Sequence, residues 1–129
     1  MGEDRLGRAI AITGDTGPCK ATVEAAADAD LLVHDASFMA EDGERARETG
    51  HSTGIEAAEI AAEAGVKMLA LVHISSRYHV GKALEEARST FGNTVAPRDF
   101  DTVEIPFPER GEPTLVPKGA KRESTPVPE

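Results

Sequence analysis

The sequence predicts an α/β fold with a mainly parallel or mixed sheet and flanking helices, and three observations support this prediction. Short apolar runs recur along the chain, segments of helical length separate them, and glycine or polar residues close most of the runs. Strands that alternate with helices at this spacing are joined by crossovers that place neighbouring strands parallel. No linker divides residues 1–107, so we expect one domain there.

The apolar runs over residues 9–13, 31–34 and 66–72 are expected to form buried strands. Gly14 closes the first run, and His34 stands at the end of the second. Residues 101–106 predict a short edge strand, because Pro106 and Pro108 cannot donate ladder hydrogen bonds. These strands would form the sheet.

Helices are expected over residues 19–27, 41–48, 55–64 and 80–91. The third has the clearest ends: Thr53 and Glu56 have the spacing of a capping box, and Gly65 suits a helix C-cap. From Pro108 onward the chain is rich in proline, glycine and charge, so residues 108–129 are predicted to be a disordered tail.

The composition limits what the protein can be. A net charge of −9 argues against a free-standing nucleic-acid-binding domain, which usually carries a basic face. The acidic surplus would suit a medium of high salt, where charges are screened within about 3 Å at 1 M. A single cysteine, Cys19, excludes an internal disulfide, and no apolar stretch approaches the roughly 20 residues of a membrane helix. We therefore expect a cytoplasmic protein.

Two residues at strand ends have the chemistry of metal ligands. Asp15 lies in a Gly-Asp-Thr turn after the first strand, where its two carboxylate oxygens could bridge two cations. His73 ends the third strand, and an imidazole held there is a good zinc ligand. The alternatives are a turn-forming aspartate and a buried structural histidine.

A second set of residues suits proton transfer and phosphate binding. Asp35, in His-Asp-Ala-Ser, could fix the tautomer of His51, in His-Ser-Thr, and leave its other nitrogen free to donate a proton. The alternatives are a loop cap for Asp35 and an unreactive helix flank for His51. Arg77 could fork onto a phosphate, although an ion pair with an acidic residue is about equally expected.

Together these segments resemble the ribonuclease Z family of the metallo-β-lactamase superfamily. The matching strings are Gly-Asp-Thr at 14–16, His-Asp-Ala-Ser at 34–37, His-Ser-Thr at 51–53 and His-Ile-Ser-Ser-Arg-Tyr at 73–78. They occur in the family's order across residues 9–80. The chain departs from the family's His-Glu-Ala-Thr at two positions, with Asp35 for glutamate and Ser37 for threonine.

The resemblance implies a tRNA 3′-end processing endoribonuclease, which hydrolyses a phosphodiester of a tRNA precursor at a two-zinc site. It implies that Asp15 bridges two zinc ions and that His73 is a further ligand. It also implies that Asp35 orients His51, which helps to protonate the leaving 3′ oxygen. A homodimer is expected, as in the family.

The resemblance covers only the family's second half. The family's His-x-His-x-Asp-His metal motif, which carries the general base, is absent from this sequence. We therefore expect residues 1–107 to be the C-terminal half of a metallo-β-lactamase αβ/βα sandwich, with an exposed apolar sheet face and no activity as an isolated chain. A gene fragment, a mis-started enzyme and one half of a split enzyme would all fit. The alternatives are another hydrolase of the superfamily and a non-catalytic interaction module.

Overall fold

A computed structural model of the chain describes residues 7–119. Its main sheet has the strand order β1-β2-β3-β4, and each neighbouring pair is parallel. The strands are β1 (Ile10–Ile12), β2 (Leu31–Asp35), β3 (Met68–Val72) and β4 (Thr94–Val95). The predicted α/β fold with a mainly parallel sheet is confirmed.

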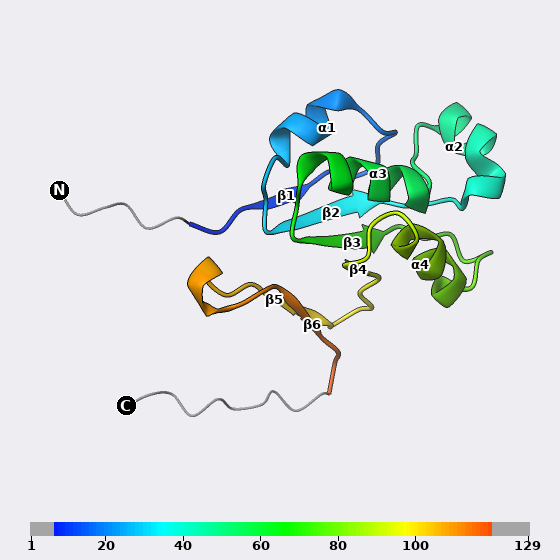
Figure 1. Ribbon diagram of the computed structural model, residues 1–129. Coiled ribbons are helices and arrows are strands. Elements are labelled where there is room, and N and C mark those ends of the chain that lie inside the picture. Colours follow the sequence, from blue (N-terminus) through cyan, green and yellow to red (C-terminus); the bar gives the residue numbers. More distant parts are fainter. Residues whose placement is uncertain (1–6, 120–129) are drawn as a thin grey trace.

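Three helices cover one face of this sheet, as Figure 1 shows. They are α1 (Lys20–Ala25), α3 (Gly54–Ala64) and α4 (Val80–Arg88). Leu32, Leu69 and Leu71 point from the strands into this layer and are almost fully buried, and small alanines of α3 allow the helix to approach them closely. A short turn, η1 (Ala40–Asp42), and α2 (Gly43–Thr49) follow β2.

Helix α3 begins and ends where the sequence predicts. The Thr53 side chain accepts a hydrogen bond from the Glu56 backbone N–H, and the Glu56 side chain accepts one from the Thr53 backbone N–H. Gly65 closes the helix with a φ of 73°, in the left-handed region that glycine adopts without strain. This capping box fixes the chain directly after His51 and Ser52.

A hairpin packs against the opposite face of the sheet. It consists of β5 (Thr102–Glu104), the turn η2 (Pro108–Arg110) and β6 (Thr114–Val116), and its strands are antiparallel. Its apolar residues cover the second small core, which is formed by Leu31, Met68, Ala70 and Val95. The hairpin residues that do so are Val103, Ile105 and Leu115.

The hairpin corrects two expectations. The predicted edge strand forms as β5, but it pairs with β6 and not with the parallel sheet. Residues 108–119 are folded and are not part of a disordered tail, because Leu115 packs on the second core and the ladder pairs it with Val103. Residues 120–129 of the predicted tail lie outside the described residues.

Beyond the hairpin this second face carries exposed apolar side chains. Ala11 packs into the helix-side core, so strand alternation directs Ile10 and Ile12 to the other face, where they are 56% and 72% exposed. The expected exposed apolar sheet face is thus present along β1. No helix within residues 7–119 is long and apolar enough to cross a membrane.

Candidate functional site

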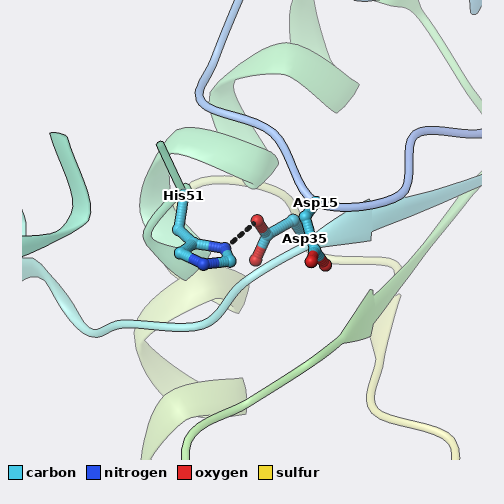
Figure 2. A group of neighbouring side chains, drawn as sticks. All are labelled: Asp15, Asp35 and His51. Carbon is cyan, nitrogen blue, oxygen red and sulfur yellow. Dashed lines mark hydrogen bonds and ion pairs between the residues drawn. The ribbon is translucent and has the colours of Figure 1, made fainter. Parts of the chain in front are cut away.

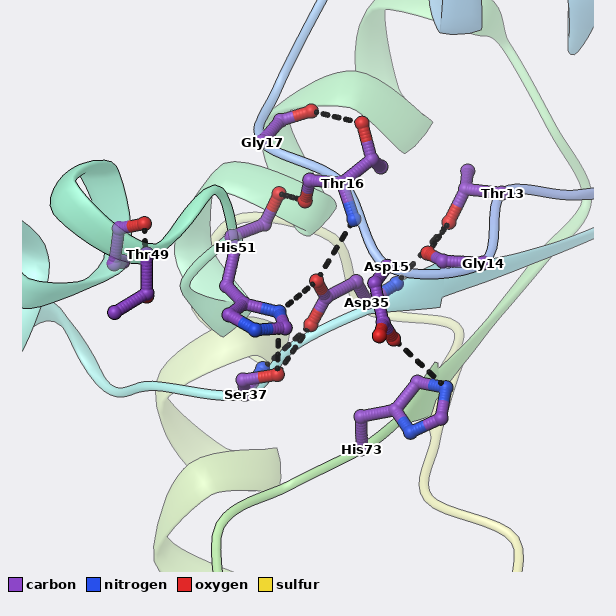
Figure 3. A network of polar contacts seen from close by, with 12 residues as sticks. Thr13, Gly14, Asp15, Thr16, Gly17, Asp35, Ser37, Thr49, His51 and His73 are labelled. Carbon is purple, nitrogen blue, oxygen red and sulfur yellow. Dashed lines mark hydrogen bonds and ion pairs between the residues drawn. The ribbon is translucent and has the colours of Figure 1, made fainter.

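The four residues singled out for catalysis and metal binding lie at one edge of the sheet. Asp15 follows β1, Asp35 ends β2 and His73 follows β3, while His51 lies in the loop before α3. The carboxyl ends of parallel strands meet at a common edge, where α/β proteins usually place their sites. Figure 3 shows the four side chains at this edge, Asp35 at the end of β2 and the others on loops.

Asp35 and His51 form a partly buried pair. The Nδ1 atom of His51 lies 2.7 Å from the Oδ2 atom of Asp35, with the aspartate fully buried and the histidine 26% exposed (Figure 2). An ionised carboxylate can only accept hydrogen bonds, so the proton of the neutral ring is on Nδ1. This leaves the Nε2 atom of His51 for chemistry at the open side of the site.

The surroundings keep Asp35 ionised. Burial raises the pKa of the Asp35 carboxyl, but hydrogen bonds from the Ser37 hydroxyl, His51 and the backbone N–H groups of Thr16 and Ser37 outweigh burial, and the pKa lies below its usual value. The Ser37 Oγ atom donates at 2.6 Å. Ser37 therefore supplies a hydroxyl hydrogen bond to this carboxylate.

Asp15 and His73 form a second pair, which is open to solvent. The Oδ1 atom of Asp15 lies 3.3 Å from the Nε2 atom of His73, and the two side chains are 64% and 55% exposed. Gly14 has a φ of 68°, and His73 has a φ of 61°, which is uncommon for a residue with a side chain. The strained backbone at His73 turns the chain at the end of β3, where the imidazole reaches Asp15.

The donor atoms of this pair suit a metal ion. Two ligands about 2.0–2.1 Å from a tetrahedral zinc ion are about 3.3 Å apart, which is the separation of Asp15 Oδ1 and His73 Nε2. The other carboxylate oxygen of Asp15 can serve a neighbouring ion. A tetrahedral site needs four ligands, so these two residues provide part of a metal site.

A different combination, Asp15 with Asp35 and His51, also brings three ligand atoms within 4.8 Å of one another. In that combination, however, both oxygens of Asp35 already accept hydrogen bonds. A metal ion there would have to displace the His51 bond. Asp15 and His73 as ligands, with Asp35 and His51 as a separate pair, therefore stay a prediction that these contacts allow.

A serine that the sequence analysis did not select joins these loops. The buried hydroxyl of Ser52 donates to the Thr16 carbonyl at 2.7 Å, while the Thr16 N–H donates to Asp35 at 3.0 Å. Since His51 precedes Ser52 and Asp15 precedes Thr16, this chain of bonds fixes the position of the Asp15 loop relative to the histidine. The only sequence signal is that Ser52 lies inside the His-Ser-Thr string.

Arg77 and His34 make no hydrogen bond or salt bridge with the two pairs of side chains at this edge. The guanidinium of Arg77 is 3.6 Å from Asp42, whose carboxylate also accepts a hydrogen bond from the Tyr78 hydroxyl. This pairing is the structural alternative for Arg77, and phosphate binding by it stays a prediction. His34 is fully buried, and its Nδ1 atom bonds to the carbonyl of Asp35, so it is separate from the open edge.

Comparison with known proteins places the chain in a family. A family model described as the beta-lactamase superfamily domain matches residues 4–74, which is more than half of the chain. The chain belongs to this superfamily. The solved structures that it resembles are metallo-β-lactamase fold proteins, in agreement with the predicted fold.

Individual relatives show which members of the superfamily the chain is similar to. The chain is 54% identical over 111 residues to ribonuclease Z of Gemmatimonas aurantiaca, covering 84% of this chain and 35% of that protein. The short form of human tRNase Z is 32% identical, with a TM-score of 0.62 over 78% of this chain and 34% of that chain. The metallo-β-lactamase fold protein YhfI of Bacillus subtilis is 28% identical, with a TM-score of 0.63 over 67% and 35%.

These matches leave most of each relative unmatched. The chain spans about 35% of the length of the ribonuclease Z proteins that it matches. Residues 4–74, which the family model matches, include Asp15, Asp35, His51 and His73. What the complete relatives do is therefore a starting point for a proposal about this chain.

Proposed function

We propose that the chain is part of a ribonuclease Z-type endoribonuclease that processes the 3′ ends of tRNA precursors. The observation that carries the proposal is the meeting of two pairs, Asp15 with His73 and Asp35 with His51, at one sheet edge. Identity of about 50% to proteins named ribonuclease Z supports the substrate class. A tRNA precursor is then the proposed substrate, and the cytoplasm is the proposed location of the protein.

Asp15 and His73 would hold the metal, for which we propose zinc. A bound zinc ion acts as a Lewis acid on the phosphodiester and lowers the pKa of a bound water. Asp15 offers a carboxylate with two oxygens and His73 a neutral imidazole, which are donors that zinc accepts. Both side chains are exposed at the sheet edge, where further ligands from another segment can approach them.

His51 and Asp35 would handle the proton of the leaving group. Asp35 holds the Nδ1 proton of His51 and fixes the direction of the ring. The Nε2 atom, when protonated, can pass its proton to the 3′ oxygen that leaves the cleaved bond. Because Asp35 stays ionised, it also stabilises the charged imidazolium from which that proton departs.

Among residues 7–119, Asp15 and His73 are the two proposed metal ligands at this edge, and none of these residues is assigned as the general base. We infer that residues 1–107 correspond to the C-terminal half of a metallo-β-lactamase domain and that a second segment completes the site. The exposed Ile10 and Ile12 offer that segment an apolar surface to pack against. A homodimer stays a prediction that analytical ultracentrifugation can check.

The proposal is tested with a chimera. The matching third of the Gemmatimonas ribonuclease Z is replaced by this chain, and cleavage of a tRNA precursor with a 3′ trailer is measured. We expect cleavage by the chimera and none by the isolated chain, since two ligands cannot hold a catalytic metal pair. A folded chimera that binds metal and leaves the precursor intact, or robust cleavage by the isolated chain, would refute this assignment.

A further inference from the structure

A groove begins beside His73 and runs toward the hairpin. One cavity, of about 320 Å³, is lined by His73 and Val80 together with Ala96, Arg98 and Asp99. A second, of about 520 Å³, shares the last three of these residues and ends at Lys118. Because the two cavities share Ala96, Arg98 and Asp99, they are neighbours beside a proposed metal ligand, and we refer to them together as the groove.

Asp101 brings the two cationic residues of this groove together. Its Oδ2 atom accepts the Arg98 backbone N–H at 2.8 Å, and its Oδ1 atom accepts the Lys118 backbone N–H at 2.9 Å. These bonds hold the pKa of Asp101 below its usual value, so the carboxylate stays charged and continues to accept both hydrogen bonds. Residues twenty positions apart in sequence are thereby fixed on the same groove.

The Arg98 guanidinium is available for a ligand. Among residues 7–119 it makes no hydrogen bond or salt bridge, although its charge contributes to lowering the pKa of the Asp101 carboxyl, whereas the guanidinium of Arg77 is paired with Asp42. A guanidinium can bind two phosphate oxygens at once. Of these two arginines near His73, Arg98 is therefore the better placed to bind a phosphate.

An aromatic ring that lines neither cavity lies beside Lys118. Phe100 is 79% exposed and has a φ of 70°, a conformation uncommon for such a residue. The Lys118 ammonium lies 5.0 Å from the centroid of its ring. An exposed ring next to cations is the combination with which proteins bind single-stranded nucleic acid, through base stacking and backbone charge.

We propose that this groove binds the single-stranded RNA next to the cleaved bond, with Arg98 and Lys118 on its phosphates and Phe100 stacked on a base. The proposal rests on the proposed function, because the metal site at His73 defines where the strand would be cut. Asp99 opposes binding, since its carboxylate also lines both cavities. Asp101 opposes it less, because its oxygens are engaged by backbone N–H groups.

The test measures binding of a fluorescein-labelled ten-uridine RNA to the full 129-residue chain by fluorescence anisotropy, so that it is independent of cleavage. The double variant Arg98→Ala/Lys118→Ala should weaken binding at least tenfold. It should also reduce the slope of log K against log salt by about 1.4, the value for two contacts to single-stranded phosphates. Phe100→Leu, which keeps an apolar side chain but no aromatic face, should weaken binding with an unchanged salt slope.

Two further variants separate a specific groove from general charge. Lys20→Ala/Lys82→Ala removes two exposed cations outside the groove and should bind RNA nearly as the unaltered chain does. Asp99→Asn should tighten binding. The proposal is overturned if the chain does not bind the RNA, if the two double variants weaken binding equally, or if Asp99→Asn weakens it. An inactive chimera with intact RNA binding would instead count against the proposed catalysis alone.

Discussion

At the scale of residues, β2 places two neighbours in opposite environments. Burial lowers the pKa of His34, and the bond to the Asp35 carbonyl and the charges of Asp35 and Glu56 oppose this effect only in part. The Nε2 atom of His34 is buried without a hydrogen-bond partner among the described residues. Asp35, one residue later, is held ionised by its hydrogen bonds. The pair thus combines a histidine kept neutral with a carboxylate kept charged.

This contrast predicts how stability depends on pH. Below a pH of about 6.5 an unfolded histidine takes up a proton while folded His34 stays neutral, so the free energy of unfolding should fall as the pH is lowered. The contribution of Asp35 is lost only below about pH 3.8, where an unfolded carboxyl is protonated. The free energy of unfolding, measured in urea between pH 7.5 and 5, should therefore show the effect of His34 and not that of Asp35.

The variant His34→Asn serves as the comparison, since its amide can still donate to the Asp35 carbonyl. Its stability should depend less on pH over the same range, although its absolute stability should be lower because the smaller side chain loses packing contacts. An equal pH dependence of the free energy of unfolding in both proteins would contradict the prediction that burial keeps folded His34 neutral.

Residue types indicated the site and the pairing of Asp35 with His51, but the contacts that hold the loops around them did not follow from the sequence. Asp15, Asp35, His51 and His73 follow from strand ends and loop strings, because a parallel sheet gathers such residues at one edge. Ser52 and Arg98 were missed, since the bond of Ser52 to Thr16 and the freedom of Arg98 depend on how distant loops pack. Nothing local in the sequence encodes those contacts.

At the scale of elements, predictability follows length and local signals. Helix α3 has a complete capping box and was predicted almost to the residue. The short strands β4 and β6 were not predicted, because two or three residues show no periodicity. β6 forms because Leu115 pairs with Val103 and packs on the second core. This tertiary contact orders a segment whose proline-rich composition predicted disorder.

The hairpin makes a testable contribution to stability. A chain that ends after Phe107 lacks β6 and uncovers Leu31 and Met68, so its free energy of unfolding should fall. Exposing one large apolar side chain to water lowers the free energy of unfolding by roughly 1.5–3 kcal/mol. A chain that ends after Gly119 keeps the hairpin and is the matched control. Equal urea midpoints for the two truncations would mean that residues 108–119 add nothing.

At the scale of the whole molecule, the sheet has one covered face and one that is partly open. Helices pack on the first face and the hairpin on part of the second, as Figure 1 shows, while Ile10 and Ile12 stay exposed. The open side chains of Asp15 and His73 lie beyond β1 and β3 of this sheet. Surface and site both fit the proposal that a second segment covers the strands and completes a metal site.

The most direct test of the central claim is the metal content of the purified chimera, compared among the unaltered protein, Asp15→Ala and His51→Ala. Loss of a ligand should empty the site, so Asp15→Ala should lose bound zinc and all cleavage. His51→Ala should retain the zinc of the unaltered chimera, and its cleavage should fall by about 10²–10⁴-fold, the usual cost of losing a general acid. Full zinc content in Asp15→Ala, or zinc loss in His51→Ala, would contradict the assignment of ligands and proton donor.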